Sequence, residues 1–295
     1  MAKQAKQKRD LYQEVTDKII AQLEKGSAPW LKPWADDSAQ ALVGFPHNAS
    51  SARSYSGVNV LLLWMAEMEN NFKASSWLTF KQAKELGGNV IKGQKGSMIT
   101  YWSTFKKENS LGEKEEIPFL KSYTVFNIEQ CENLNTDKLK TVKAYQQPEG
   151  FAHVQEFIDA TGANITHGGN KAFFAPGPDK IAMPHPEQFN DLENYYATLL
   201  HELTHWSGSK KRLNREMGKR FGDNAYAAEE LIAEMGAAFL CAQHGLTGEL
   251  QHADYIQTWL KVLKEDKRAI FTAASKATKA AEYLTQFNEA QQLAA

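Results

Sequence analysis

The sequence predicts an α+β protein of two domains, a mixed α/β domain over residues 1–140 and a mainly helical domain with a small sheet over residues 141–295. Short runs of strand-forming residues bounded by glycine turns are concentrated between residues 90 and 127. Apolar residues at helical spacing fill much of the second half. The chain has 295 residues, 42% of them hydrophobic and 23% charged, which is ordinary for a globular protein and sufficient for one large core or two modest ones.

Three helices are expected in the first domain. Apolar periodicity predicts an amphipathic helix over residues 11–23, which ends near Gly26. The WLKPW element at residues 30–34 interrupts the periodicity and is expected to be a loop. A second helix is expected over residues 58–69, and a short third one begins at Thr79 and is stopped by two glycines.

The strands of the first domain follow these helices. Residues 90–92 and 97–102 flank a glycine-containing turn and are expected to form a hairpin, and residues 123–127 form a further strand. The stretch 106–116 is rich in charge and is expected to be an exposed loop between strands. The boundary between the domains is expected within residues 136–150.

The second domain is expected to begin with a helix over residues 151–161. Residues 171–175 and 179–183 flank Pro-Gly-Pro and predict a β-hairpin. Its edge strand is either an ordinary sheet edge or a site where an extended peptide pairs through backbone hydrogen bonds. The apolar positions between residues 254 and 287 predict one long or two shorter packing helices.

The most informative motif is His201-Glu202-Leu203-Thr204-His205, an HExxH arrangement that ends a run without helix breakers. Histidines four residues apart on a helix lie on one face, so both imidazoles can reach a single metal ion. Glu202 is then placed to take a proton from an attacking water, as the general base of a metallopeptidase does. The motif therefore predicts half of a catalytic zinc site.

A third ligand is expected on the helix that covers residues 226–240. Glu229 shares a stripe with small residues, which would allow close approach to the HExxH helix, and it is the expected ligand. In the alternative, Glu230 binds the metal and Glu234 supports a histidine. Two imidazoles and a carboxylate suit Zn²⁺ best, although they also accept Mn²⁺ or Co²⁺. The residues that could assist the scissile carbonyl, among which the sequence does not choose, are Tyr195, Tyr196, Tyr226 and His185.

The charge of the chain is unevenly distributed. Residues 1–107 carry 15 Lys and Arg against 9 Asp and Glu, a balance of +6, so the remainder carries −7 to give the net charge of −1. Five of the seven tryptophans lie in the same segment. Cations that meet phosphates and rings that stack on unpaired bases are what a single-stranded nucleic-acid site needs. The candidate residues for such a site are Trp30, Trp34, Arg53, Tyr55, Trp77, Lys81, Lys84, Lys92, Lys95 and Trp102.

The remaining composition predicts a cytoplasmic protein. Two cysteines, Cys131 and Cys241, cannot make a disulfide framework. The basic N-terminus lacks the apolar stretch of a signal peptide, and no segment has the length needed to span a bilayer. A basic run between residues 210 and 220 is either a further phosphate-binding segment or, more commonly for such runs, a solvated loop.

Several blocks in fixed order resemble one known family. WLKPW, then SYSGVN, WLTFKQAKELGG, KGQKGSMITYW, VFNIEQ, HELTHWSG and YAAEELIAEMGAAF are similar to the ArdC-type antirestriction proteins of conjugative plasmids, and the likeness spans nearly the whole chain. A related N-terminal module also begins plasmid TraC-type primases. The resemblance implies an N-terminal domain that binds single-stranded DNA without sequence preference, and a C-terminal zincin-like metallopeptidase domain with His201, Glu202, His205 and Glu229 or Glu230 in its site.

These features leave competing functional hypotheses. In the first, single-stranded DNA recruits the protein, which protects incoming plasmid DNA and cleaves a host restriction enzyme or another DNA-bound protein. In the second, DNA binding or occupation of a restriction complex protects by itself, and the metal site is structural or vestigial. In the third, the N-terminal domain is a protein-interaction module with incidental affinity for DNA. Glu202→Gln separates the first hypothesis from the second.

Overall fold

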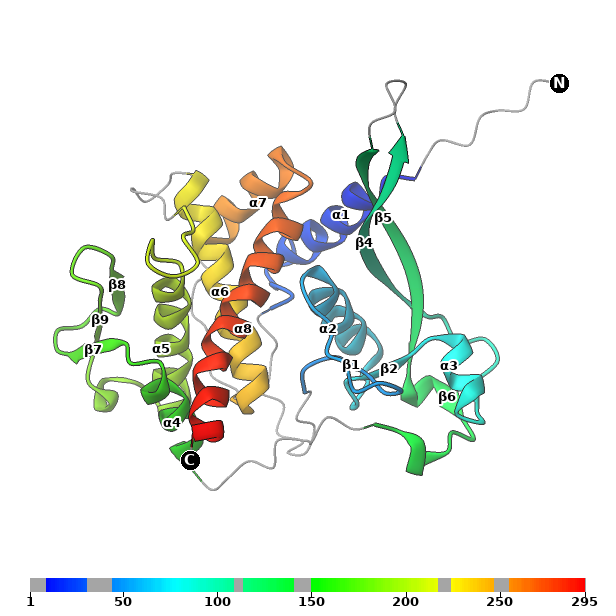
Figure 1. Ribbon diagram of the computed structural model, residues 1–295, viewed down its shortest axis with the longest axis horizontal. Coiled ribbons are helices and arrows are strands. Elements are labelled where there is room, and N and C mark those ends of the chain that lie inside the picture. The colour runs from blue at the N-terminus through cyan, green and yellow to red at the C-terminus, as the bar shows by residue number, and fades with distance from the viewer. Residues whose placement is uncertain are drawn as a thin grey trace.

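The computed structural model describes residues 9–30, 44–108, 114–140, 150–216, 224–246 and 255–294. Within these ranges, the N-terminal part combines helices with two sheets, and the C-terminal part is mainly helical with a three-stranded sheet (Figure 1). The predicted α+β class is therefore confirmed. No helix in the described ranges is long and apolar enough to cross a membrane.

The helices of the N-terminal part are α1 (Leu11–Leu23), α2 (Val58–Asn70) and α3 (Phe80–Glu85). The side chain of Asp10 accepts a hydrogen bond from the Gln13 amide and starts α1. Thr79 and Gln82 form a capping box at the start of α3, and Gly87 follows its end at φ 84°. All three helices lie where the sequence predicts them.

The strands of this part form a larger and a smaller sheet. They are β1 (His47–Asn48), β2 (Ser76–Leu78), β3 (Asn89–Val90), β4 (Ser97–Glu108), β5 (Lys114–Asn127) and β6 (Cys131–Glu132). The larger sheet has the order β1-β2-β5-β4, in which β1 and β2 are parallel and the other pairs antiparallel. The smaller sheet pairs β3 with β6. Short 3-10 helices cover Ile128–Gln130, Thr136–Lys138 and, later, Pro186–Gln188.

The expected hairpin between residues 90–92 and 97–102 is wrong. β3 pairs with β6, and β4 pairs along its whole length with β5, from Ser97↔Val125 to Glu108↔Lys114. This register satisfies far more backbone groups than a three-residue hairpin would. Gly96 permits it, because a Cβ atom there would lie 2.3 Å from Cγ2 of Thr124. The turn is present, but the strands on its two sides pair with other strands instead of with each other.

The charged stretch 106–116 is also more ordered than expected. Its two ends are paired strand residues, and only 109–113 lie outside the described ranges. Opposite charges face each other across the two strands, as in Lys106↔Glu116 and Lys107↔Glu115, and such pairs favour this register. The long β4–β5 hairpin runs beside α2, and its far end projects past α1 (Figure 1).

The C-terminal part contains five helices in the described ranges. They are α4 (Ala152–Ala160), α5 (Leu192–Ser207), α6 (Asn224–His244), α7 (Ile256–Glu265) and α8 (Ala269–Ala294). Strands β7 (Asn164–His167), β8 (Phe173–Ala175) and β9 (Lys180–Met183) form a sheet of order β7-β9-β8, which lies beside α5 (Figure 1). The predicted β8–β9 hairpin is confirmed, and the apolar pattern of residues 254–287 belongs to two helices.

One hydrophobic core joins the two parts. Buried residues of α1 and α2 belong to the same cluster as those of α4 to α8. Thr16 donates a hydrogen bond to the Lys267 carbonyl at 2.8 Å, and Thr278 accepts one from the Gly57 amide at 2.9 Å. The division at residues 140 and 141 stays a prediction, because residues 141–149 lie outside the described ranges. The shared core indicates that the first helices support the helices that carry the candidate site.

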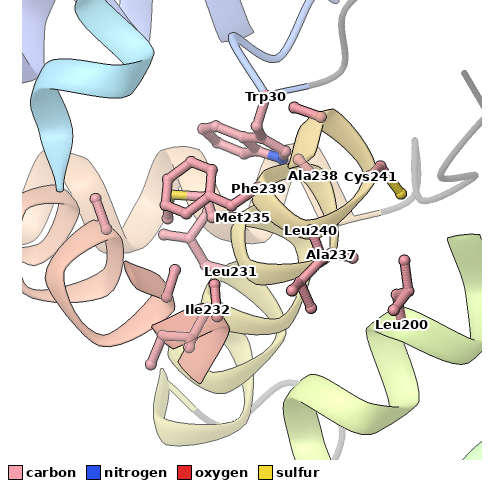
Figure 2. Close-up of a cluster of buried hydrophobic side chains, with 14 of the residues drawn as sticks. Trp30, Leu200, Leu231, Ile232, Met235, Ala237, Ala238, Phe239, Leu240 and Cys241 are labelled. Atoms are coloured by element: carbon pink, nitrogen blue, oxygen red, sulfur yellow. The ribbon is translucent and has the colours of Figure 1, made fainter. Parts of the chain in front are cut away.

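Trp30 is part of this shared core. Its side chain is 2% exposed and makes an edge contact with Trp259 at 5.4 Å between ring centroids. Figure 2 shows it with Met235, Ala238 and Phe239 of α6. Trp30 therefore anchors the N-terminal part on α6 and has no ring face free for a base.

Candidate functional site

Helix α5 presents the two histidines of the HExxH motif on one face. Asp191 caps the helix, and no glycine or proline interrupts it before Gly208. His201 is buried and His205 nearly so, and their Nε2 atoms lie 3.1 Å apart. Two ring nitrogens this close can be joined by one shared proton or by one metal ion.

Helix α6 brings Glu230 to the same point. Its Oε2 lies 3.6 Å from His201 Nε2, and its Oε1 lies 3.5 Å from His205 Nε2. These three residues form the one group in the described ranges whose ligand atoms all lie within 4.8 Å of one another.

The donor set fits a divalent ion. Ligand atoms about 2.1 Å from a tetrahedral metal are separated by about 3.4 Å. The two Nε2 atoms here lie 3.1 Å apart, and each lies 3.5 or 3.6 Å from a different oxygen of the Glu230 carboxylate. Two imidazoles and one carboxylate are also the ligands of many catalytic zinc sites, which keep the fourth position open. The three side chains could therefore hold such an ion with little rearrangement.

Glu229, the first-choice ligand of the sequence analysis, lies outside this group. Its carboxylate accepts hydrogen bonds from Arg215, with Nη2 at 2.7 Å from Oε1 and Nε at 3.0 Å from Oε2. Oε1 also lies 3.3 Å from His205 Nδ1, the ring nitrogen that faces away from Glu230. The geometry therefore favours Glu230 over Glu229 as the third ligand. The helical stripe that suggested Glu229 could not indicate its contact with Arg215.

Glu234 takes the place that the alternative arrangement gives it. One turn after Glu230, it is fully buried, and its Oε1 lies 3.6 Å from His201 Nδ1. Each candidate ligand histidine thus has a carboxylate behind it, Glu234 for His201 and Glu229 for His205. Such carboxylates fix the ring orientation and the tautomer of a metal-binding histidine.

Electrostatics in the metal-free site are dominated by these contacts. Burial lowers the pKa of His205. Hydrogen bonds to Glu229 and Glu230 and the charge of Glu202 outweigh this effect and raise the pKa to about 10. Burial raises the pKa of Glu230, whereas hydrogen bonds from His201 and His205 outweigh it and hold that pKa well below its usual range. The carboxylates around the two histidines therefore favour a positive charge at this point.

A close approach of α5 and α6 makes this arrangement possible. A Cβ atom on Gly236 would lie 2.5 Å from Cγ2 of Thr204, so the two helices meet at this glycine. Thr204 turns its hydroxyl back to the Leu200 carbonyl at 2.8 Å, so its methyl group faces α6. The small residues noted in the sequence thus do bring the two helices together.

Two further residues of the site have chemistry that a hydrolase uses. Glu202 is buried, and in the sequence it lies between the two histidines. Tyr226 lies one turn before Glu230 on α6, and its hydroxyl is 3.3 Å from that of Tyr255. Burial, the contact with Tyr255 and the Glu230 carboxylate together raise the pKa of Tyr226, which keeps it a hydrogen-bond donor.

The other three candidates for assisting a carbonyl contact residues outside the group of candidate ligands. Tyr195 and His167 form a hydrogen bond of 2.9 Å, and Tyr196 donates to Gln155 at 3.2 Å. His185 contacts the His167 ring at the start of a 3-10 helix. Tyr226 is therefore the best placed of the four.

Several of the expected DNA-binding residues are accessible, but two are not. Trp77 is fully buried and donates to Glu67 at 3.2 Å, and Trp30 is buried as described above, so their assignment as stacking residues is wrong. Both belong to the core because strand β2 and the loop after α1 turn them inward. Trp34 lies outside the described residues.

The remaining candidates lie on or near the surface. Arg53, Lys92 and Lys95 are exposed, and Tyr55 is half-buried against two hydrophobic clusters. Lys81 forms an exposed pair with Glu85 at 3.5 Å. Lys84 donates a hydrogen bond to the Asn89 side chain, and its ammonium group lies 5.9 Å from the Phe80 ring centroid.

Trp102 is 60% exposed on β4, and it has aromatic neighbours that the sequence analysis missed. Residues that alternate along a strand, together with their direct partners, share one face of a hairpin. By this rule, the face opposite Trp102 carries an aromatic group, which we call the aromatic face: Tyr101, Phe105, Phe119 and Tyr123.

The aromatic face contains ring pairs and one cation. Tyr101 and Tyr123 make an edge contact with centroids 6.0 Å apart, and Phe105 and Phe119 lie 5.9 Å apart. Lys121, directly opposite Tyr101, holds its ammonium group 4.8 Å from the Phe119 centroid. Alternation along the two strands would have revealed this face, had residues 106–116 been assigned to strands instead of a loop.

The basic run after α5 supports the helix instead of facing solvent as a whole. Arg212 stacks over Trp206 at 3.7 Å from the ring centroid and pairs with Asp179 of the β8–β9 turn. Arg215 is buried against Glu229. Lys210 and Lys211 are exposed, whereas the later lysine and arginine at 219 and 220 lie outside the described ranges.

Comparison with known protein families divides the chain into two matched segments. Residues 9–126 match the N-terminal domain of anti-restriction factor ArdC, and residues 152–276 match a zincin-like metallopeptidase domain. The candidate metal site lies entirely within the second segment, and the β4–β5 hairpin lies within the first.

Whole-length relatives agree with this division. Protein y4eC of Sinorhizobium fredii is 36% identical over 96% of this chain and 94% of its own length. Two DNA primases TraC of Escherichia coli are each 34% identical over 96% and 97% of this chain, which spans only 20% and 28% of their lengths.

Solved structures show the same fold. The crystal structure of antirestriction protein ArdC from plasmid R388, free of metal, is 42% identical and superposes with a TM-score of 0.81 over 95% of this chain and 98% of its own. The Mn(II)-bound structure of that protein superposes with a TM-score of 0.78 over the same shares. The chain therefore belongs to the ArdC family of antirestriction proteins.

Proposed function

We propose that the C-terminal part is a metal-dependent peptidase whose ion is held by His201, His205 and Glu230. The convergence of their three ligand atoms in a buried site carries this proposal. The Mn(II)-bound form of the R388 protein supports a divalent ion. Zinc is the expected native metal, since two imidazoles and a carboxylate suit it best, and manganese is the alternative.

The side chains around the ion have distinct roles in peptide hydrolysis. A bound divalent ion supplies Lewis acidity, which polarises the scissile carbonyl and lowers the pKa of water. Glu202 accepts a proton from the attacking water on its carboxylate and passes it to the leaving amine. The Tyr226 hydroxyl donates a hydrogen bond to the carbonyl oxygen as that oxygen gains negative charge.

The N-terminal part, in the same proposal, binds single-stranded DNA without sequence preference. The support is the exposed rings of the β4–β5 hairpin, the net positive charge of residues 1–107 and the relatedness to DNA primases. Rings stack on unpaired bases whatever the sequence. Trp102 and the aromatic face supply the rings, and Lys121, Lys92, Lys95 and Arg53 supply cations.

Together these activities would act in the cytoplasm of a cell that receives plasmid DNA. The protein coats or is recruited by the entering strand, and its peptidase cleaves a restriction enzyme or another protein bound there. In the second candidate function, DNA binding alone protects the plasmid and the metal site is dispensable. The convergence of His201, His205 and Glu230, with Glu202 in the same motif, favours the first.

Plasmid transfer into a restricting recipient separates the two functions. We expect Glu202→Gln to reduce transfer to the level of a strain without the protein, while its metal and DNA affinities stay unchanged. A hairpin variant, Tyr101→Ala with Trp102→Ala, should lose both transfer and affinity for single-stranded DNA. Normal transfer by Glu202→Gln, with failure of the hairpin variant, would instead establish protection by DNA binding.

A further inference from the structure

Arg215 is a buried cation whose charge the proposed chemistry does not use. Its side chain is 4% exposed, and it lies in the loop that follows α5. The guanidinium donates to the Thr204 carbonyl at 2.6 Å and to the Ser207 hydroxyl at 3.0 Å, besides its two bonds to Glu229. It therefore ties the last turn of α5, which carries His205, to α6.

The fork of Arg215 engages both oxygens of the Glu229 carboxylate. Such bidentate pairing fixes the carboxylate plane and neutralises its charge. A carboxylate held in this way is a poor metal ligand, because its lone pairs and its charge are already committed. Glu230, the next residue, contacts no arginine in the described ranges and points both oxygens at the two histidines.

The same contact orients His205. With Arg215 on one side, Glu229 Oε1 accepts from His205 Nδ1 at 3.3 Å. In a neutral ring, such as one that binds a metal ion through Nε2, this contact places the proton on Nδ1 and leaves the Nε2 lone pair turned toward Glu230 and His201.

The chain leaves room for the guanidinium at one glycine. A Cβ atom on Gly208 would lie 2.5 Å from Nη2 of Arg215. The Arg215 amide also donates to the Gly208 carbonyl at 2.8 Å, which closes the loop around the side chain. The position of Arg215 is thus built by local sequence and does not depend on Glu229 alone.

We propose that Arg215 is a positioning residue that decides which of two adjacent glutamates binds the metal. It reserves Glu229 for His205 and leaves Glu230 as the third ligand. This inference rests on the proposed metal site and adds to it the group that selects the ligand. Without the guanidinium, Glu229 becomes a buried carboxylate beside the ion, able to compete with Glu230.

The test measures metal affinity, which requires no knowledge of the peptide substrate. Zn²⁺ is titrated into the full-length protein in competition with a chromophoric chelator, and Co²⁺ absorption reports the ligand set. The variants are Arg215→Met, Arg215→Lys and Lys211→Met, the last a matched loss of an exposed cation in the same loop. Far-ultraviolet circular dichroism checks that each is folded.

We expect Arg215→Met to bind Zn²⁺ about 10 to 100 times more weakly and to change the Co²⁺ spectrum, because outer contacts of ligands typically contribute this much. Arg215→Lys should lie between, and Lys211→Met should match the wild type. Wild-type affinity and spectrum in folded Arg215→Met would overturn the inference.

A second pair of variants keeps the test decisive if Arg215→Met does not fold. Glu230→Gln should abolish tight Zn²⁺ binding, whereas Glu229→Gln should keep one ion at about 10- to 100-fold lower affinity. A greater loss in Glu229→Gln than in Glu230→Gln overturns the inference but leaves the metal site standing. If the wild type binds no ion, the proposed peptidase itself fails.

Discussion

The candidate metal site and the β4–β5 hairpin invert the usual distribution of side chains in opposite ways. At the metal site, charged groups such as Glu229, Glu230 and Arg215 are buried. On the hairpin, Tyr101 and Trp102 are more than half exposed. Folded proteins seldom do either without a reason, because buried charges cost free energy and exposed aromatic patches attract other molecules.

The two inversions are compensated differently. Inside, the Glu229 carboxylate pairs with Arg215 and the Glu230 carboxylate faces the two histidines, so these buried charges have partners in the folded protein itself. On the hairpin, the rings contact one another and Lys121, but Tyr101 and Trp102 stay more than half exposed. The inner site is therefore complete before it binds its ion, whereas the outer one is completed only by a ligand.

The largest loss of stability is expected at a tryptophan that lies inside the fold. Trp77→Ala removes a fully buried ring and leaves Glu67 without the indole donor. We expect a loss of about 3 to 5 kcal/mol in the free energy of unfolding. Urea denaturation measures it. A loss below about 1 kcal/mol, with reduced DNA affinity in the folded protein, would return Trp77 to the DNA surface.

His244 is a buried histidine of α6 whose protonation the fold opposes. Burial, with a smaller contribution from His153, lowers the pKa of His244 to about 4. Below pH 6.5 the unfolded chain takes up a proton that the folded chain refuses, so stability should fall between pH 6.5 and 4 and no further below that. The loss is at most about 3 kcal/mol.

Urea denaturation at pH 7 and pH 4.5 measures this effect. In His244→Gln the difference between the two free energies of unfolding should shrink, while in the control His185→Gln, which changes an exposed histidine, it should equal that of the wild type. An equal pH dependence in His244→Gln and the wild type would mean that His244 is protonated in the fold.

Metal removal has an effect of similar size. An ion at about 100 times its dissociation constant stabilises the folded state by about 2.7 kcal/mol, if the unfolded chain does not bind it. Addition of a chelator should therefore lower the unfolding temperature of the wild type. The matched Glu230→Gln protein should show no shift between metal and chelator, and an equal shift there would contradict the proposed ligand set.

Sequence reasoning succeeded where the determining contacts are local. The bounds of α1, the α3 cap, the HExxH spacing and the β8–β9 turn are all encoded within a few residues of one another. It failed where a distant residue decides. β4 pairs with β5 instead of β3, and the pairs that involve the predicted strand 97–102 join residues 18 to 28 positions apart in sequence, as in Trp102↔Leu120 and Ser97↔Val125.

For the same reason, the sequence did not separate Glu229 from Glu230 as the third ligand, and the geometry favours Glu230. Both residues fit a helix that faces α5, and their neighbours in sequence do not distinguish them. The distinction comes from Arg215, which is 14 residues away from Glu229 and reaches it across the loop after α5. Likewise, composition alone marks tryptophans as aromatic but does not say that Trp30 and Trp77 face inward while Trp102 faces out.

The smallest expected effect on stability is at the exposed tryptophan. Trp102→Ala should change the free energy of unfolding by no more than about 0.5 kcal/mol, because the side chain is 60% exposed. Its affinity for single-stranded DNA should nevertheless fall by about 1 to 3 kcal/mol, the contribution of one stacked base. Fluorescence anisotropy with a labelled oligonucleotide at two salt concentrations measures this loss.

Salt distinguishes the loss of stacking from the loss of charge. Trp102→Ala should weaken binding equally at both concentrations, whereas Lys121→Met, on the opposite face, should reduce the dependence of affinity on salt because it removes a phosphate contact. If both variants bind like the wild type, the hairpin is not the DNA surface, and its exposed rings must then be completed by a protein. Substitution of tryptophan by alanine would thus give both the largest and the smallest change in stability, because Trp77 is buried and Trp102 is exposed on strands of the same sheet.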